Sequence, residues 1–189
     1  MMSKPWDKAL PHPNSYTKEG YDHINLIDSS ESLLGRSLAL RSINPISHPI
    51  LGNFLAIDGL WGFVGTKNHD DRCRRLWGNR LRTFISRQEK RPYVPNLKAL
   101  IIDAYDLYLQ SHQHILDELL DNELPIDCYL TRSRNGKPLR ERPPYAAWLL
   151  YGLNHIKLAI IHHEAPDLQL FMDNTSLDLY DINILLGEN

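Results

Sequence analysis

Apolar residues at helical spacing fill two long parts of the chain, and no other feature limits its possible folds as strongly. Between residues 97 and 120 they recur every three or four positions, in two consecutive segments. Pro95 and Asn96 suit the start of the first helix, and Leu124-Pro125 ends the second. A further apolar helix is predicted over residues 146–161. The chain is therefore expected to be mainly α.

Two shorter stretches favour strands. Alternating apolar positions predict one strand at residues 23–27, and residues 126–130 are predicted to form another. Asp28 followed by Glu31 has the spacing of a capping box, which predicts a short helix behind it. Asn135-Gly136 is a typical turn pair. The expected fold is thus a single helical domain with one or two short β-strands.

The two ends of the chain differ from its middle. Residues 1–22 are rich in Pro, Lys, Tyr and Asn and show no period, which predicts an irregular N-terminal arm. Residues 164–189 carry acidic side chains and no Lys or Arg, so they form an acidic extension that either folds back on basic residues or stays solvated. We therefore expect one domain over residues 23–163, a length that can bury its own core.

Composition excludes several classes of protein. The 21 Lys and Arg nearly balance the 23 Asp and Glu, so a net charge of -2 gives no overall attraction to nucleic acid or to an anionic membrane. Only Cys73 and Cys128 are present, which is too few for a disulfide framework or a four-cysteine zinc site. No apolar run is long enough for a signal peptide or a membrane span. The sequence predicts a cytoplasmic protein with no membrane partner.

Between residues 34 and 61 several short motifs follow one another at fixed spacing. They are Leu34-Gly35-Arg36-Ser37-Leu38, Pro45, His48-Pro49, Gly52, Phe54 and Ile57-Asp58-Gly59-Leu60-Trp61. This series resembles the start of the NADAR (YbiA-like) superfamily domain, whose pattern reads Leu-Gly-Arg-x-Leu-Ser-Asn-Phe, a Pro, His-Pro, and Val/Ile-Glu-Gly-Tyr-Trp, and it aligns without gaps. The similarity continues to about residue 160, through positions such as Thr66-Lys67, Trp77-Gly78 and Gly136-Lys137.

The resemblance implies a mainly helical fold with a cleft for ADP-ribose or a related phosphoribosyl group. It implies hydrolysis of an N-glycosidic bond to a base, so the expected ligand is an ADP-ribose-like nucleotide or an ADP-ribosylated base. Cleaving such a bond passes through an oxocarbenium-like state, which a carboxylate can stabilise while it orients water. Asp58 stands where the family has its acidic residue, and it is the candidate catalytic group.

Four further residues are candidates for substrate binding. Trp61 offers an indole face on which a base can stack. Arg36 and Arg82 can make bidentate contacts to a diphosphate. Arg41 is the fourth candidate, and it belongs to Ala39-Leu40-Arg41, which replaces the family's Ser-Asn-Phe and so removes two hydrogen-bonding side chains. This replacement favours a second hypothesis, a catalytically altered protein that binds a nucleotide, a nucleic acid or a protein partner, for example as an inhibitor in phage-host conflict.

Each of these candidates also has an ordinary structural interpretation. Asp58 precedes Gly59, and Asp-Gly is common in turns. Trp61 lies between apolar neighbours and can belong to the core, whereas Arg36 can simply cap or solvate the end of a helix. The sequence leaves both interpretations open for each residue.

A run of basic residues overlaps a segment with a helical period, residues 73–85, that is interrupted near Gly78. Arg72, Arg75 and Arg82 fall on one stripe of this period, so the chain can bind a nucleic-acid backbone there, or the stripe is a solvated face. The histidines lack the spacing of a metal site, and no phosphate-binding or dinucleotide motif is present. Neither a metal nor a cofactor is expected.

Overall fold

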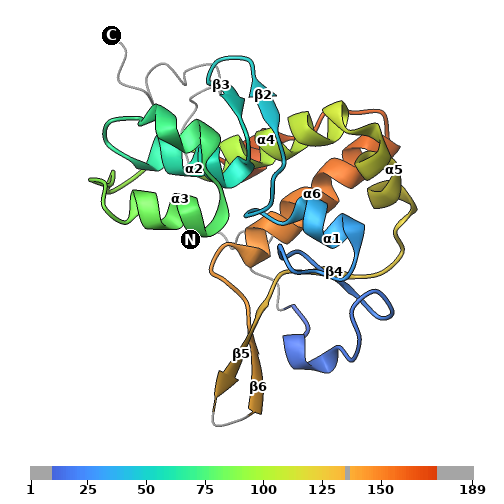
Figure 1. The fold of residues 1–189 in the computed structure, drawn as a ribbon. Helices are drawn as coiled ribbons and strands as arrows, with labels where there is room; N and C mark the ends of the chain where they lie inside the picture. Colours follow the sequence, from blue (N-terminus) through green and yellow to red (C-terminus); the bar gives the residue numbers. More distant parts are fainter. Residues whose placement is uncertain (1–9, 135–136, 174–189) are drawn as a thin grey trace. The chain divides into compact units, whose positions relative to one another are not determined.

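The computed structural model describes residues 10–134 and 137–173, and three of the helices in it lie where the apolar period predicts long helices. The stretch between residues 97 and 120 forms α4 (Leu97–Ser111) and α5 (Gln113–Asp121), and the third predicted helix is α6 (Ala146–Ile161). Helices make up most of the regular structure (Figure 1). The prediction of a mainly α fold is confirmed.

The strands are short and pair two by two. β1 (Ile24–Asn25) and β4 (Ile126–Asp127) lie within the two predicted strand segments and pair in parallel. β2 (Ile46–His48) pairs antiparallel with β3 (Gly52–Phe54), and β5 (Leu130–Arg134) pairs antiparallel with β6 (Lys137–Glu141). The described residues therefore contain more strands than predicted, because short hairpins of three to five residues show too little alternation to be recognised.

Contacts between Cα atoms divide the chain into two compact units. The first comprises residues 1–39 and 114–166, and the second comprises residues 40–113 and 167–189. Each unit is thus built from segments far apart in the sequence. The boundaries predicted at residues 22 and 163 stay predictions, and the predicted Asn135-Gly136 turn lies outside the described residues.

In the first unit, the short helix predicted behind Asp28 and Glu31 is confirmed, but a different residue caps it. α1 (Leu33–Leu38) starts after Ser32, whose side-chain oxygen accepts a hydrogen bond from the Gly35 N–H at 2.8 Å. Ser32 therefore satisfies one of the free N–H groups of the first turn. The capping box at Asp28 and Glu31 was a wrong prediction, because a serine nearer to the helix takes that role.

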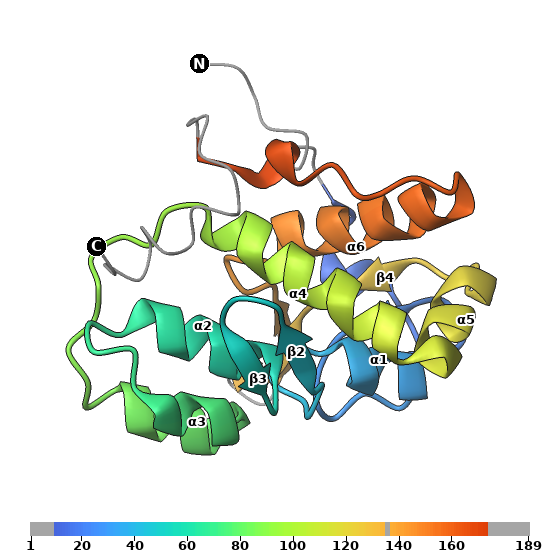
Figure 2. The same ribbon diagram turned by 90° about the horizontal axis from the view of Figure 1, so that it is seen from above.

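In the second unit, α2 (Ile57–Gly65) packs against both α4 and α3 (Gly78–Ile85), as Figure 2 shows. A 3-10 helix, η3 (Asp71–Arg75), connects α2 to α3 and also packs on α2. The chain leaves the helical conformation at Trp77, and Gly78 then has a φ of +54°, which an L side chain rarely adopts. The predicted interruption near Gly78 is therefore a complete break between two helices.

Residues 167–173 of the acidic extension belong to the second unit. A 3-10 helix, η4 (Leu168–Phe171), packs on α4, and Phe171 is fully buried. Asp173 and Asn96 exchange two hydrogen bonds of 3.1 Å, each between a backbone N–H and the other residue's side chain. Asn96 precedes α4 with a φ of 52°, so these bonds hold the start of that helix.

The structure also bears on insertion into a bilayer. No helix within residues 10–134 and 137–173 has the length and the apolar character needed to cross a membrane.

Candidate functional site

The start of α2 holds Asp58 in a fixed position. Ala56 precedes the helix and offers no side-chain cap, so the first N–H groups need another acceptor. Asn44, which is fully buried, supplies one: its side-chain oxygen accepts a hydrogen bond from the Ile57 N–H at 2.7 Å. Asp58 is the next residue, in the first turn, where the helix dipole favours a negative charge.

Two glycines explain how tightly the neighbouring segments approach this helix. A Cβ atom on Gly59 would lie 2.6 Å from the backbone oxygen of Cys73 in η3. A Cβ atom on Gly62 would lie 3.1 Å from the side chain of Leu81 in α3. Because Gly59 and Gly62 have no side chain, η3 and α3 can pack closely over the turn of α2 that carries Asp58.

The carboxyl group of Asp58 is buried and only half satisfied. The residue is 9% exposed, and its Oδ2 atom accepts a hydrogen bond from the Gly78 N–H at 2.7 Å. This bond satisfies one of the free N–H groups at the start of α3. The Oδ1 atom is buried and has no hydrogen-bond partner among the described residues. A buried polar atom without a partner is uncommon and calls for an explanation.

Burial raises the pKa of Asp58 to about 6, because the charged form loses its hydration. The Gly78 N–H, the positive charge of Arg41 and, least of all, the nearby Gly59 N–H act in the opposite direction and limit this rise. The group can therefore exchange a proton close to neutral pH, as a general acid or base must. A carboxyl with a perturbed pKa is also a recognised mark of a functional site, although structural groups can share it.

Two of the predicted binding residues lie close to Asp58 in the structure. Trp61 lies on α2 one helical turn after Asp58 and is half-buried, and Arg41 is half-buried and acts on the Asp58 charge. Arg82 is exposed on α3, and no hydrogen bond or ion pair joins its guanidinium to another described residue. Asp58, Trp61 and Arg41 therefore form the candidate site.

Arg36 belongs to α1 in the first unit. Its Nη1 atom donates hydrogen bonds to the backbone oxygens of Ser30, at 2.7 Å, and Glu31, at 3.0 Å. These bonds occupy one end of the guanidinium with local carbonyl groups. Arg36 thus has a structural role beside its own helix, which was one of the two interpretations that the sequence left open.

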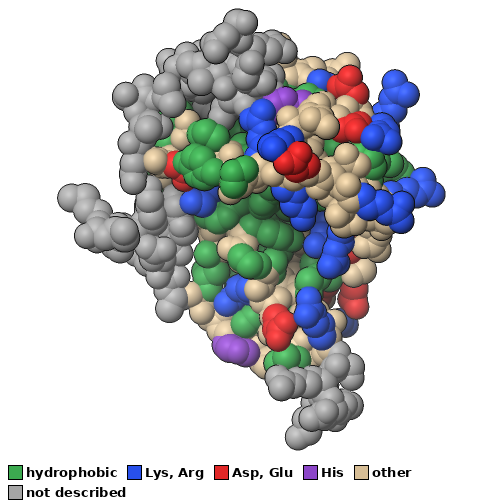
Figure 3. Space-filling model, turned by 90° about the vertical axis from the view of Figure 1, so that its left-hand side faces the viewer, with side chains coloured by type: hydrophobic (Ala, Val, Ile, Leu, Met, Phe, Trp, Pro, Cys, Tyr) green, Lys and Arg blue, Asp and Glu red, His purple; other side chains and the backbone are tan. Residues whose placement is uncertain are grey.

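The basic run does not lie on one continuous helix, since the break at Gly78 places Arg72 and Arg75 on η3 and Arg82 on α3. Arg72 pairs with Asp70 at 2.6 Å, and its guanidinium lies 4.5 Å from the centre of the Phe84 ring. Arg75 and Arg82 are exposed and form no ion pair within the described residues. On the face shown in Figure 3, Lys and Arg side chains outnumber Asp and Glu side chains.

Sequence reasoning missed a second polar cluster in the second unit. His48 is buried, and its Nδ1 atom accepts hydrogen bonds from the Ile50 and Leu51 N–H groups, so its Nε2 atom carries the proton. That Nε2 atom lies 3.5 Å from an oxygen of Asp103. Burial, and next the charge of Asp103, raise the pKa of Asp106 to about 6. The sequence signal that could have revealed this cluster is the pair of aspartates, Asp103 and Asp106, three residues apart in an apolar helix.

Neither metal-site geometry nor known proteins add an assignment. Within the described ranges, no three His, Cys, Asp or Glu side chains are grouped so that they could hold a metal ion. No family model, curated protein or solved structure matches the chain. The interpretation of the site therefore depends on its residues and their geometry.

Proposed function

We propose that this chain is an N-glycosyl hydrolase of the NADAR (YbiA-like) type, acting on an ADP-ribosyl or related phosphoribosyl substrate. One observation carries the proposal: Asp58, at the position of the family's acidic residue, is a buried carboxyl with one oxygen anchored and the other without a hydrogen-bond partner among the described residues. An anchored oxygen fixes the group, and an unpaired oxygen is available to a substrate or to water.

The chemistry expected of Asp58 follows from the transition state. As the bond between ribose and base breaks, positive charge develops on the sugar, and an ionised carboxylate held nearby stabilises it. The same carboxylate can orient the water that attacks the anomeric carbon and accept its proton. Arg41 favours the ionised form, because its charge lowers the pKa of Asp58. Trp61 supplies a face on which the base can stack.

The residues that stand in place of the family's Ser-Asn-Phe limit how a ribose could be bound. Ala39 and Leu40 are apolar and buried, with 1% and 7% of their surfaces exposed, so their side chains cannot bond ribose hydroxyls. Under this proposal Arg41, which follows them, supplies a positive charge that the family's Phe does not have. We therefore expect the phosphates, more than the ribose hydroxyls, to determine affinity.

Turnover can be tested directly. The full chain is incubated with ADP-ribosylated guanosine, and the released ADP-ribose is followed by chromatography. Asp58→Asn is expected to lower kcat by about 100-fold or more, because it removes the charge that stabilises the transition state. Asp71→Asn is the matched control, since it removes an exposed carboxylate of the same unit. Equal turnover by the wild type and Asp58→Asn would refute the role of Asp58.

A second candidate function is nucleic-acid binding, favoured by two exposed arginines, Arg75 and Arg82, that form no ion pair with any residue the structure describes. Binding of a labelled oligonucleotide is measured at several salt concentrations. The Arg75→Gln and Arg82→Gln substitutions are each expected to reduce the salt slope by roughly one. Arg72→Gln should have a smaller effect, because Arg72 already pairs with Asp70. Binding without any salt dependence would exclude this function.

A further inference from the structure

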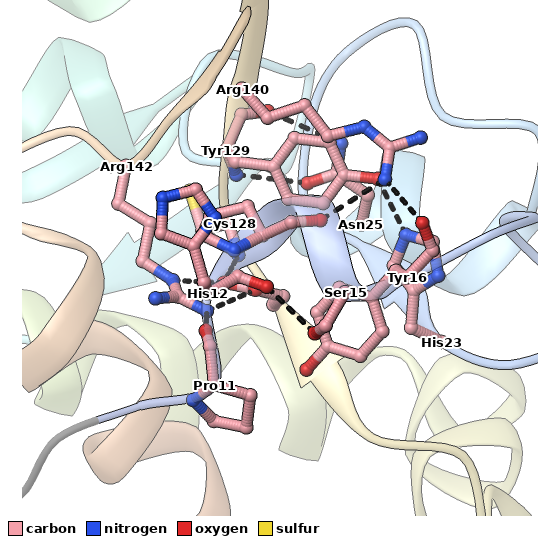
Figure 4. A network of polar contacts seen from close by, with 12 residues as sticks. Pro11, His12, Ser15, Tyr16, His23, Asn25, Cys128, Tyr129, Arg140 and Arg142 are labelled. Carbon is pink, nitrogen blue, oxygen red and sulfur yellow. Dashed lines mark hydrogen bonds and ion pairs between the residues drawn. The ribbon is translucent and has the colours of Figure 1, made fainter.

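The arm that residues 10–22 form in the first unit is held in place by two arginines from the end of the β5–β6 hairpin (Figure 4). Arg140 donates a hydrogen bond to the backbone oxygen of Tyr16 at 2.7 Å. Arg142 donates to the backbone oxygen of Pro11 and pairs with Asp127, which is 1% exposed, at 2.5 Å. A pair so well buried is costly to break, so the arm is an ordered wall of this unit.

The side chain of Tyr16 is held as firmly as its backbone. Its ring stacks on His23 with centres 4.3 Å apart and an angle of 17° between the rings. His23 is itself fully buried between Asp22 and the Tyr129 hydroxyl, at 2.6 Å from each. His23 therefore covers one face of the Tyr16 ring and holds the ring in place.

Tyr16 lines a cavity of about 680 Å³ that lies between the arm, the end of α5 and one side of α6. This volume is typical of sites for small organic ligands. Most of the wall is aliphatic, and the two tyrosines add aromatic surface. The lining includes Tyr16, Leu119, Leu124, Ala147, Leu153 and Tyr151.

The charges at the cavity do not favour an ion. Lys157 donates a hydrogen bond from Nζ to the backbone oxygen of Asn122 at 2.7 Å, where it offsets the negative end of α5. Glu123 also lines the cavity and has the opposite charge. One cation, one anion and a helix end thus leave little net field, and burying a charged ligand there would be costly.

We infer that this cavity binds a neutral, planar aromatic molecule, with its ring against Tyr16 and its edges among the aliphatic residues. Aliphatic walls give the binding energy through burial, and the fixed phenol ring selects planar ligands by stacking. The site lies entirely within the first unit. It is independent of the proposed chemistry at Asp58.

The test compares two fluorescent dyes with the same ring system, the neutral N-phenyl-1-naphthylamine and its anionic 8-sulfonate, each titrated into the full chain. The neutral dye is expected to bind about tenfold more tightly. Ala147→Phe fills the cavity from α6 and should weaken the neutral dye by about tenfold or more. Leu158→Phe is the matched control, because Leu158 is exposed on the same helix and does not line the cavity.

Two further variants test the parts of the inference separately. Tyr16→Leu should weaken the neutral dye by about tenfold, whereas Tyr21→Leu, at a 78% exposed tyrosine, should not. Lys157→Met should change the affinity for the neutral dye by less than about threefold, since Lys157 serves the end of α5. Far-UV circular dichroism checks that each variant is folded. Equal binding of both dyes, or equal effects of Ala147→Phe and Leu158→Phe, would overturn the inference.

Discussion

Replacing Asp58 by asparagine should stabilise this protein at alkaline pH while it removes the proposed catalytic group. The asparagine side chain would keep an oxygen that can accept the hydrogen bond from the Gly78 N–H, so the start of α3 would stay satisfied. It would not carry the buried negative charge. The expected effect therefore depends on pH, and its sign follows from the direction of the pKa shift.

The pKa of Asp58 rises from 3.8, the value of an aspartate in water, to about 6 in the folded chain. A raised pKa means that the folded state has no ionisation cost below pH 3.8 and loses stability as the pH rises toward about 6. The full loss is roughly 3 kcal/mol, because a tenfold change in an ionisation constant corresponds to ~1.4 kcal/mol. Asparagine avoids this loss but buries an NH₂ group without a partner, at a cost of about 1–2 kcal/mol. A net gain of about 1–2 kcal/mol remains at alkaline pH.

The assay is urea unfolding of the wild type and Asp58→Asn near pH 4 and near pH 8, followed by far-UV circular dichroism. Near pH 8 the variant should be the more stable protein. Near pH 4, where the wild-type carboxyl is largely protonated, the variant should be equal or less stable. The difference between the two pH values, roughly 2.4 kcal/mol, does not depend on the cost of the unpaired NH₂ group.

Asp28→Asn is the control, because Asp28 is exposed and its replacement removes one charge without removing a buried carboxyl. The reasoning is refuted if Asp58→Asn and Asp28→Asn change the pH dependence of stability equally. It is also refuted if Asp58→Asn lowers stability at both pH values by the same amount, since Asp58 would then act only through its hydrogen bond.

Three further predictions concern packing, and each is read from the free energy of unfolding. Gly59→Ala should cost about 1–3 kcal/mol because its Cβ would meet a backbone oxygen of η3, whereas Gly65→Ala on the same helix should be nearly neutral, its nearest neighbour lying 4.0 Å away. Phe171→Ala should cost about 3–5 kcal/mol, and a small loss would mean that η4 contributes little to the second unit. Tyr129→Phe should cost about 1–3 kcal/mol, because it leaves the Nε2 atom of the buried His23 without its hydrogen-bond partner, and no loss would mean that this bond adds nothing to stability.

Much of the helical structure could be predicted from the sequence, because an amphipathic helix shows its period within a single segment. The bounds of α6 agree with the predicted residues 146–161, and α4 begins one residue after Asn96 as expected. The short hairpins escaped prediction, since three residues cannot establish an alternation. Ser32, and not Asp28, caps α1, because two candidate caps lay close together and only packing chose between them.

The sequence by itself determined which residue types are available at the candidate site. It places an acidic residue and a tryptophan one helical turn apart, and it places glycines on the same helix where neighbouring segments approach. Only the tertiary structure decided the acidity of Asp58, because its pKa depends on burial by η3 and α3 and on a hydrogen bond from Gly78, twenty residues away. The partner of Ile57 is likewise distant, at Asn44. Helix period is a local property of the chain, whereas desolvation and charge pairing depend on what other segments place around a group.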